Sequence, residues 1–481
     1  MRVEHALIHR KERGLVRRAR SVRDFLAHEA LVVLAVAGIV TALAIAMPKM
    51  VVPDTWLALV DGRWIADHGL PHTDSIALWT RHVEWVDQQW LAHLFLYELA
   101  HIGGTKLVLF VALAIDIAAV CVAAYGARLA GASQRSTALC LLTAFLVAPW
   151  LLQARTQTLA LPLFVAVYVL LAADARRASR GVFFVFPLLV LSANLHGSAA
   201  LAAALVVLHG LLTLRREPLK GIGLSALAPL CLLASPYGID VVGYYHRLLI
   251  GSPLPSYVDE WAPTKLEADT VAFFGLTFVT VVLLARHARS TTLFERFALP
   301  ALILVGLLAG RNTGWLGLGF AVSGPFLVDA AWSPARLLDE RIPRLNVGLS
   351  SVAIGIAALA LLVRAVESES SLLDSWRNAG ARAVATAAGP SGLVLADDLH
   401  SDWLLWRRPE LTGRVAYDVR FELLSEPRLR ALQAFQEGLA PKSFVLPYRV
   451  LTFASAADAS RLAPAATVVY QDPEFVVVRR G

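Results

Sequence analysis

The sequence predicts a mainly α-helical, polytopic membrane protein with a small α/β domain at its C-terminal end. Three observations predict this fold class. The chain of 481 residues is 57% hydrophobic and only 17% charged, whereas soluble domains contain about 25% charged residues. Long apolar runs recur along most of the chain. After Arg364 these runs stop, and the composition becomes that of a small soluble domain.

The apolar runs are the expected transmembrane spans, because about 17–25 such residues cross a bilayer. We expect about eleven spans, at residues 28–48, 105–127, 134–152, 157–174, 181–195, 197–214, 219–235, 269–286, 293–310, 312–331 and 346–365. The chain then divides into a basic N-terminal segment (residues 1–27), a transmembrane domain (residues 28–366) and a C-terminal domain (residues 367–481).

The orientation in the membrane follows from the positions of lysine and arginine, which are enriched in cytoplasmic connections. Every second connection is rich in them, at residues 128–135, 176–180, 215–220, 286–296 and 336–344. The short outer turns hold at most one each, at Arg155 and Arg311. We therefore expect a multi-pass protein of the inner or plasma membrane, with a cytoplasmic N-terminus and an extracytoplasmic C-terminal domain. The net charge of +7 belongs to this pattern and does not indicate nucleic-acid binding.

The first outer loop, residues 49–104, is expected to be ordered. Residues 54–67 have the spacing of a helix, and His68-Gly69-Leu70-Pro71 would end it. Asp54, which follows Pro53, would also suit the N-cap of this helix. A second, Trp-rich amphipathic stretch from Trp85 to Ala100 is expected to lie in the membrane interface.

Two other regions have a predicted secondary structure. Loop 236–268 contains several prolines, and a short helix is expected near residues 239–250. In the C-terminal domain, helices are expected at 374–388 and 425–438, and strands at 393–395, 444–446, 467–470 and 475–478. This alternation predicts a small α/β domain. Asp397, Asp398 and Asp402 are interpreted as part of a polar turn, because no matching set of metal ligands follows them.

Several short motifs stand in order along the chain. The first outer loop contains Pro53-Asp54-Thr55-Trp56, Gly62-Arg63-Trp64-Ile65, His68-Gly69-Leu70-Pro71, Asp74-Ser75 and Trp85-Val86-Asp87-Gln88-Gln89-Trp90-Leu91. Later come Arg155-Thr156-Gln157, Asn194-Leu195-His196-Gly197, Ser235-Pro236-Tyr237-Gly238 and Glu260-Trp261. In order and spacing, these motifs resemble those of bacterial polytopic membrane proteins of the GT-C glycosyltransferase superfamily. The resemblance covers most of the chain and implies a GT-C-like bundle.

The resemblance implies a transferase that moves a sugar from a polyprenyl-phosphate-linked donor to a glycan, lipid or protein acceptor on the outer face. It implies that Asp54 is the general base, which takes the proton of the acceptor hydroxyl. The other candidate residues would bind the substrates: Arg155 and Arg311 the phosphate, His196 and Tyr237 phosphate or sugar, Asp87 and Glu260 the acceptor, and Trp56, Trp85 and Trp90 a sugar face.

The chain also departs from the family pattern. The family has an acidic residue where this chain has Val52, and an Asn-His-Glu stretch where this chain has Asp87-Gln88-Gln89. A divalent metal remains an option as cofactor, although these changes remove ligands for it. Two alternatives stay open: a non-catalytic binding or assembly protein on the same scaffold, and a transporter, which Asp116 in the second span would favour.

Overall fold

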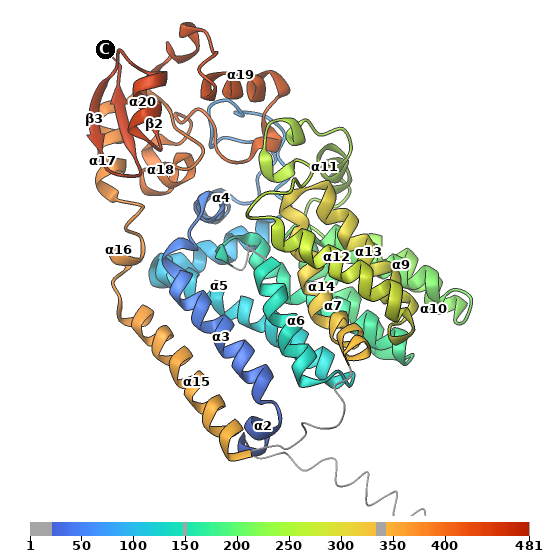
Figure 1. Cartoon of the computed structure of the whole chain (residues 1–481). Helices are drawn as coiled ribbons and strands as arrows, with labels where there is room; N and C mark the ends of the chain where they lie inside the picture. The colour runs from blue at the N-terminus through green and yellow to red at the C-terminus, as the bar shows by residue number, and fades with distance from the viewer. Residues whose placement is uncertain (1–21, 148–151, 333–342, 481) are drawn as a thin grey trace, which may run out of the picture.

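The computed structural model describes residues 22–147, 152–332 and 343–480. A bundle of long helices carries a small domain of helices and strands at one end, and the C-terminus lies in that domain (Figure 1). Most of the expected basic segment at residues 1–27 lies outside the described residues, and so do Arg336 and Arg341.

The bundle helices lie where the apolar runs predict them. A short helix α2 (Val22–His28) comes first, and a 3-10 turn η3 (Arg180–Phe184) leads into α8. The bundle itself contains α3 (Ala30–Ala46), α5 (Trp90–Leu129), α6 (Gln134–Val147), α7 (Thr156–Arg176), α8 (Val185–Ala193), α9 (Ala199–Thr213), α10 (Pro218–Cys231), α12 (Val271–His287), α13 (Leu293–Leu308), α14 (Thr313–Ala331) and α15 (Pro343–Val366).

The lengths of these helices define a multi-pass membrane protein. Among the described residues, six helical segments are long and apolar enough to cross a membrane, and they contain α3, α5, α7, α12, α14 and α15. Four shorter apolar segments of 10–17 residues contain α6, α8, α9 and α10. The mainly helical membrane fold is therefore confirmed, whereas the number of eleven spans stays a prediction.

Helix α5 consists of two parts joined at a pair of glycines. Gly103 and Gly104 have non-helical backbone angles, and the φ of Gly104 is +70°, a value that glycine adopts readily. The second part begins at Thr105, where the second span was expected. The glycine pair thus separates a helix of the first loop from a helix of the bundle.

Helix α4 (Pro53–His68) confirms the first predicted helix of the loop. It ends at Gly69, whose φ is +82°. The expected N-cap role of Asp54 was wrong, because the cap is Val52, whose backbone N–H donates to Thr55 Oγ1 at 3.0 Å. Asp54 lies in the first turn instead, where a carboxylate interacts favourably with the positive end of the helix dipole.

The Trp-rich stretch that follows is only partly helical. Helix α5 begins at Trp90, so the expectation of a helix from Trp85 was wrong. The Trp85 N–H donates to the carbonyl of His72 at 3.0 Å. Residues 85–89 are therefore held against the loop that follows α4 and cannot join a helical ladder.

Helices α4 and α5 are in close contact through Gly62. A β-carbon at this position would lie 2.2 Å from the backbone oxygen of His93. Because no real side chain tolerates such a contact, glycine is required for α4 to pack this closely on α5. This packing fixes the position of the Asp54 end of α4 over the bundle.

The C-terminal domain contains a four-stranded sheet with the order β1-β2-β4-β3, in which β1 pairs parallel to β2 and the other pairs are antiparallel. Its elements are α16 (Glu369–Leu372), α17 (Asn378–Ala388), β1 (Leu393–Leu395), α18 (Ser401–Arg407), α19 (Glu426–Gln436), β2 (Tyr448–Phe453), α20 (Ala456–Leu462), β3 (Thr467–Gln471) and β4 (Val476–Arg479). The strand expected at 444–446 was wrong, because residues 442–445 form a 3-10 turn and the strand begins after Pro447.

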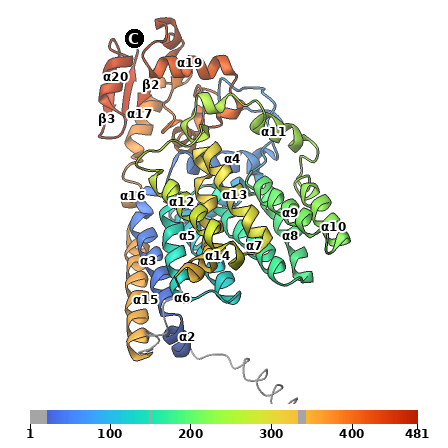
Figure 2. The same ribbon diagram turned by 45° about the vertical axis from the view of Figure 1, so that its right-hand side comes forward.

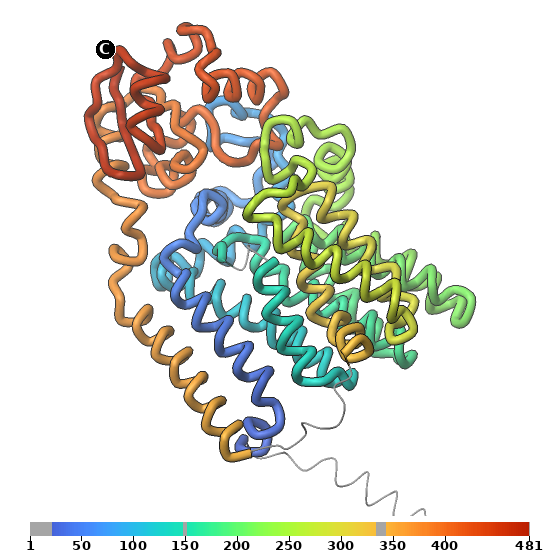
Figure 3. The backbone as a smooth tube through the Cα atoms, viewed as in Figure 1, coloured from blue at the N-terminus to red at the C-terminus, as the bar shows by residue number. Residues whose placement is uncertain are grey.

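One end of the bundle is covered by a layer that we call the capping layer. It consists of α4, the loop 69–89, α11 (Asp240–Leu249), the segment 250–262 and the C-terminal domain, which lie together in both views (Figures 1 and 2). Helix α15 runs along α3 and leads through α16 into the C-terminal domain (Figure 3). Arg63 of α4 holds that domain by donating to the carbonyls of Leu405 and Trp406 at 2.8 and 3.1 Å.

Candidate active site

A cavity of about 510 Å³ lies between the bundle and the capping layer. We call it the main cavity. Its walls come from the first turns of α4, α7, α9 and α14, from α11 and from residues 419–422 of the C-terminal domain. Asp54, His196, Glu260 and Arg311, all predicted from the sequence, line it. The structure therefore brings together side chains that are up to 257 residues apart in the chain, between Asp54 and Arg311.

The N-terminal ends of four helices point toward this cavity. Pro53 begins α4, Thr156 begins α7, Ala199 begins α9 and Thr313 begins α14. Each helix N-terminus carries partial positive charge and free backbone N–H groups. Their convergence makes the main cavity a favourable place for an anion.

Four charged side chains, the cavity quartet, lie beside these helix ends. Arg155 Nη1 is 3.7 Å from Asp54 Oδ2 and 3.7 Å from Glu260 Oε2. Arg311 Nη1 is 3.2 Å from Glu260 Oε1. Arg155 is 6% exposed, whereas the side chains of Asp54 and Glu260 are 42% and 43% exposed. Glu260 thus bridges the two arginines from the solvent-accessible side.

Glu260 is ionised because of its two cationic neighbours. Burial alone would raise its pKa, but the charges of Arg311 and Arg155 more than offset that effect, and the pKa is lowered from its usual value. Glu260 belongs to the 3-10 turn η5 (Asp259–Trp261). The next residue, Trp261, covers Arg311 with its ring, at 4.2 Å from the guanidinium carbon to the ring centroid.

His196 is a neutral hydrogen-bond donor to the cavity. Burial, followed by the charges of Arg311 and Arg155, holds its pKa well below the usual range. The backbone N–H of Ser198 donates to His196 Nδ1 at 3.1 Å. Because Nδ1 is an acceptor here, the proton of the neutral ring is on Nε2.

Five predicted site residues lie outside the wall of the main cavity. Tyr237 is buried, and its hydroxyl donates to the carbonyl of Pro71 at 3.0 Å. Trp56 is buried beneath the C-terminal domain, with its ring centroid 5.4 Å from that of Trp376. The structure does not bring these side chains to the main cavity.

The other three, Trp90, Asp87 and Trp85, are also engaged in packing. Trp90 Nε1 donates to Asn194 Oδ1 at 2.8 Å. Asp87 is buried and lies 2.9 Å from Nδ1 of His93. Trp85, which was expected to present a sugar face, is buried with the Arg420 guanidinium 4.2 Å from its ring centroid. These contacts hold the first loop in place.

The residues that the structure describes do not form a metal site. Within the described part of the chain, no group of three or more histidine, cysteine, aspartate or glutamate residues is arranged to hold a metal ion. In the main cavity, the two acidic side chains of the quartet already face arginines. We therefore assign no step to a divalent metal.

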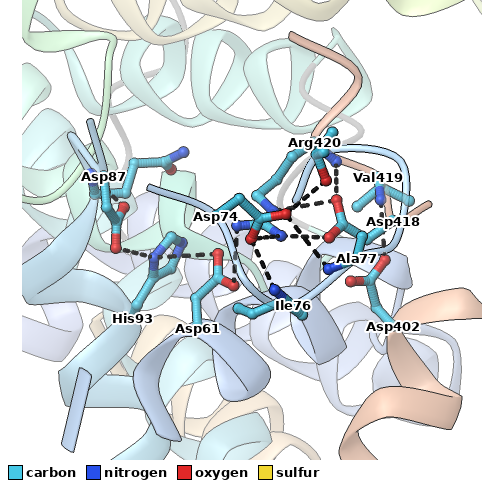
Figure 4. Close-up of polar contacts among 12 residues, drawn as sticks. Asp61, Asp74, Ile76, Ala77, Asp87, His93, Asp402, Asp418, Val419 and Arg420 are labelled. Atoms are coloured by element: carbon cyan, nitrogen blue, oxygen red, sulfur yellow. Dashed lines mark hydrogen bonds and ion pairs between the residues drawn. The ribbon is translucent and has the colours of Figure 1, made fainter. Parts of the chain in front are cut away.

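A second group of charges, the buried ionic cluster, joins the C-terminal domain to the first loop (Figure 4). At its centre, Arg420 Nη2 donates to Asp74 Oδ1 at 2.9 Å and also to Asp418. Asp74 in turn accepts from the Thr80 hydroxyl at 2.5 Å. All these side chains are buried, so the cluster is a polar contact sealed from solvent.

Asp61 of α4 is the unusual member of this cluster. It is fully buried, and neither carboxylate oxygen has a hydrogen-bond partner among the described residues. Its nearest charged neighbours are Arg420 Nη1 and His93 Nδ1, both at 3.8 Å. Burial raises the pKa of Asp61 to about 8, although Arg420 and His93 oppose this shift. Asp61 therefore carries a proton at neutral pH.

Sequence reasoning missed the part of the cavity wall that the C-terminal domain supplies. Arg420 and Glu422 both line the main cavity, although Asp418-Val419-Arg420-Phe421-Glu422 resembles an ordinary polar segment of a soluble domain. Gln89 and Gln157 also line it, and both lie inside motifs that the sequence made conspicuous. Glu422, in contrast, lies in no motif that would have marked it as a site residue.

The fold can be compared with those of solved structures. The multi-pass helical bundle with its C-terminal domain over one end is similar to a fold found in membrane glycosyltransferases. Solved structures that share it include ArnT from Cupriavidus metallidurans, bound to undecaprenyl phosphate and in the apo state. No known protein family and no curated protein matches the chain by sequence.

The likeness to ArnT extends over nearly the whole chain. The complex with undecaprenyl phosphate is 13% identical, with a TM-score of 0.51, over 93% of this chain and 97% of that one. The apo structure is 15% identical, with a TM-score of 0.53, over 93% and 96%. At this identity the likeness shows the fold. The predicted GT-C-like fold is therefore confirmed.

Proposed function

We propose that the protein is a membrane glycosyltransferase that moves a sugar from a polyprenyl-phosphate-linked donor to an acceptor on the outer face of the membrane. The observation that carries this proposal is the position of Arg155 and Arg311. Arg311 lines the main cavity at the N-terminal end of α14. Arg155, at the N-terminal end of α7, lies 3.7 Å from Asp54 and from Glu260, which both line this cavity at the edge of the apolar bundle. A lipid-linked phosphate suits this place, because its phosphate can bind the arginines and its lipid chain can contact the apolar bundle. The ArnT complex, in which undecaprenyl phosphate is bound to the same fold, supports this choice of lipid.

The donor phosphate would be held by charge and by directional hydrogen bonds. Guanidinium groups bind phosphate oxygens through paired N–H donors. Arg155 and Arg311 supply these donors, and the four helix N-termini add partial positive charge. The neutral His196 adds an Nε2–H donor that does not depend on protonation of the ring at pH 7.

Asp54 would be the general base. During transfer, the acceptor oxygen forms a bond to the anomeric carbon while the bond from that carbon to the phosphate oxygen breaks. The hydroxyl proton passes to the Asp54 carboxylate, and the electron pair leaves with the polyprenyl phosphate. Asp54 is solvent-accessible in the main cavity and lies 3.7 Å from Arg155, so base and leaving group can share one site.

The location follows from the same proposal. The main cavity lies under the capping layer, which contains the segments that the sequence assigns to the extracytoplasmic side. We therefore place the C-terminal domain and the reaction outside an inner or plasma membrane. A labelling experiment tests this placement. The three native cysteines (Cys121, Cys140 and Cys231) are replaced, and a single cysteine is introduced at the exposed Ser256. We expect a membrane-impermeant thiol reagent to label this cysteine in whole cells.

The activity is tested with the full-length protein in liposomes. Undecaprenyl-phosphate-linked sugars of several kinds are supplied, and release of undecaprenyl phosphate is measured with wild type and with Asp54→Asn. We expect Asp54→Asn to lower turnover roughly 10²- to 10⁴-fold, the usual contribution of a general base. Asp67→Asn, on the exposed end of the same helix, is the matched control and should keep the wild-type rate.

Two results would decide against this activity. Binding of undecaprenyl phosphate without turnover of any donor would favour the non-catalytic binding protein. Solute uptake driven by an ion gradient in the same liposomes would favour a transporter, and Asp116, buried in α5 without a hydrogen-bond partner among the described residues, would then be the residue to replace.

A further inference from the structure

A second cavity, of about 550 Å³, lies beside the main cavity. Its walls come from residues 83–86 of the first loop, residues 244–254 at the end of α11 and beyond, and residues 421–424 of the C-terminal domain. All three segments belong to the capping layer, and no bundle helix contributes to the walls. The second cavity therefore lies within the capping layer.

The two cavities share one wall. Four residues line both of them: Tyr244 and Leu248 of α11, and Phe421 and Glu422 of the 3-10 turn η10 (Phe421–Leu423). The two cavities are therefore adjacent at these residues, and a molecule in the second cavity would lie next to the main cavity on the side away from the bundle.

The second cavity is lined by polar and charged side chains as well as apolar ones. Its rim carries Glu84 and Arg247, whose charged atoms are 3.8 Å apart and whose side chains are exposed. His246 and Ser252 line it as well, together with the aromatic side chains of Trp85, Tyr244 and Phe421. Aromatic rings and polar groups in one cavity suit a ligand with many hydroxyl groups and apolar ring faces.

Glu422 is the acidic group on the shared wall. The residue is exposed to the cavities, and within the described part of the chain it forms no ion pair. The enclosing protein raises its pKa to about 6, mainly by burial. At pH 7 most of this group is a carboxylate, and unlike the carboxylates of the quartet it is not paired directly with an arginine among the described residues.

We propose that the second cavity binds the saccharide part of the acceptor, and that Glu422 accepts a hydrogen bond from an acceptor hydroxyl at the shared wall. This inference rests on the proposed function, in which the donor occupies the main cavity and Asp54 takes the proton. The acceptor then approaches from the capping layer while the lipid-linked donor approaches from the bundle, so the two substrates do not compete for one entrance.

Binding can be tested without knowledge of the natural acceptor. Methyl glycosides of glucose, galactose, mannose and N-acetylglucosamine are mixed with the full-length protein in nanodiscs, and saturation-transfer difference NMR detects contact. We expect at least one glycoside to give a signal with wild type. Ser252→Trp, which fills the second cavity, should abolish it. Ser256→Trp, an exposed position of the same loop outside the cavity wall, should leave it unchanged.

A second variant changes charge rather than volume. Glu422→Gln should weaken the same signal at least threefold at pH 7.5, and the wild-type signal should fall toward that of the variant as the pH drops below 6. Glu437→Gln, an exposed acid of the same domain, is the control. Once an acceptor supports transfer, Glu422→Gln should raise the acceptor KM more than it lowers kcat.

The outcomes separate this inference from the proposed function. No glycoside signal with wild type, or a signal that survives both Ser252→Trp and Glu422→Gln, would overturn the acceptor site. Undecaprenyl phosphate binding should be unaffected by Ser252→Trp, because Ser252 lines the second cavity and not the main cavity. If that lipid does not bind even the wild type, the proposed function fails, whereas the glycoside measurement still reports on the second cavity.

Discussion

The cavity quartet and the buried ionic cluster contain similar residues but differ in how those residues are held. In the quartet, charged atoms are 3.2–3.7 Å apart, and the acidic side chains are more than 40% exposed. In the buried ionic cluster, Arg420 is 2.9 Å from Asp74, and both are sealed from solvent. Arg420 also lines the main cavity, so the buried ionic cluster borders the same space as the quartet.

This difference separates charges that can exchange partners from charges that cannot. Exposed ion pairs contribute little to stability, because water replaces them at small cost. A buried charge that loses its partner is strongly destabilising. We therefore expect substitutions in the quartet to change ligand binding and substitutions in the buried cluster to change the attachment of the C-terminal domain.

The largest expected effect is that of Arg420→Ala on stability. This change leaves Asp74 and Asp418 buried without their cation, and we expect a loss of about 3–5 kcal/mol. Thermal unfolding in detergent, together with limited proteolysis of the C-terminal domain, measures it. Arg430→Ala removes an exposed pair with Glu426 and should have no measurable effect. An unfolding midpoint for Arg420→Ala equal to that of wild type would show that the cluster does not hold the domain.

Arg311→Ala should weaken ligand binding without lowering the stability of the protein. We expect affinity for undecaprenyl phosphate to fall roughly 10- to 100-fold, which corresponds to the loss of charged hydrogen bonds worth about 1.5–3 kcal/mol. The unfolding midpoint should stay close to that of wild type, because the side chain is 20% exposed and pairs with an exposed carboxylate. Lipid titration followed by tryptophan fluorescence reports the affinity. Unchanged affinity would remove Arg311 from the phosphate site.

Asp61 makes the stability of the buried cluster depend on pH. Its pKa is raised to about 8 in the folded protein, so the folded state keeps a proton that the unfolded state loses near pH 4. The stabilisation is complete below about pH 4 and is lost as the pH rises through 8. Over two pH units below 8 the loss is about 2 kcal/mol.

Replacement of this carboxyl group isolates its contribution. Asp61→Asn keeps the shape and cannot ionise, so its unfolding midpoint should fall less than that of wild type between pH 6 and pH 8. Asp67→Asn serves as the exposed control. Identical pH profiles for wild type and Asp61→Asn would mean that Asp61 is ionised in the folded protein.

The smallest effect is expected for Glu260→Gln. Removal of this charge frees Arg155 and Arg311 from a competing anion, and affinity for undecaprenyl phosphate should rise about two- to fivefold, as for an exposed ion pair of up to 1 kcal/mol. Asp259→Asn, which removes the same charge from the neighbouring residue, is the matched control and should change affinity less. A decrease in affinity for Glu260→Gln would show that this carboxylate assists the phosphate.

The parts of the site that the sequence could predict are those at helix ends. The apolar runs and the charge alternation predict that Asp54, Arg155, His196 and Arg311 lie at helix ends on one side of the bundle, and the family resemblance made them candidate site residues. In the structure, Asp54, His196, Arg311 and Glu260 line one cavity, and Arg155 lies 3.7 Å from Asp54 and from Glu260. Their roles in transfer remain proposals.

Other features depend on packing that leaves no local pattern. Trp56 and Tyr237 look like site residues in their motifs, but the C-terminal domain and the first loop bury them. Arg420 and Glu422 become part of the site only because that domain lies on α4. The strand expected at 444–446 was displaced by Pro447, which cannot donate to a ladder and instead precedes β2.

Glu260 is also expected to weaken the binding of small anions in the main cavity. Because its carboxylate already balances Arg155 and Arg311, the empty protein does not attract every small anion in the surrounding water. A free phosphate ion would only replace the Glu260 carboxylate as the partner of the two arginines, so its net binding free energy would be small. A ligand that also places a hydrocarbon chain against the bundle gains the hydrophobic contribution in addition. The position of the Glu260 carboxylate between Arg155 and Arg311 can thus favour a lipid-linked phosphate over the free phosphate.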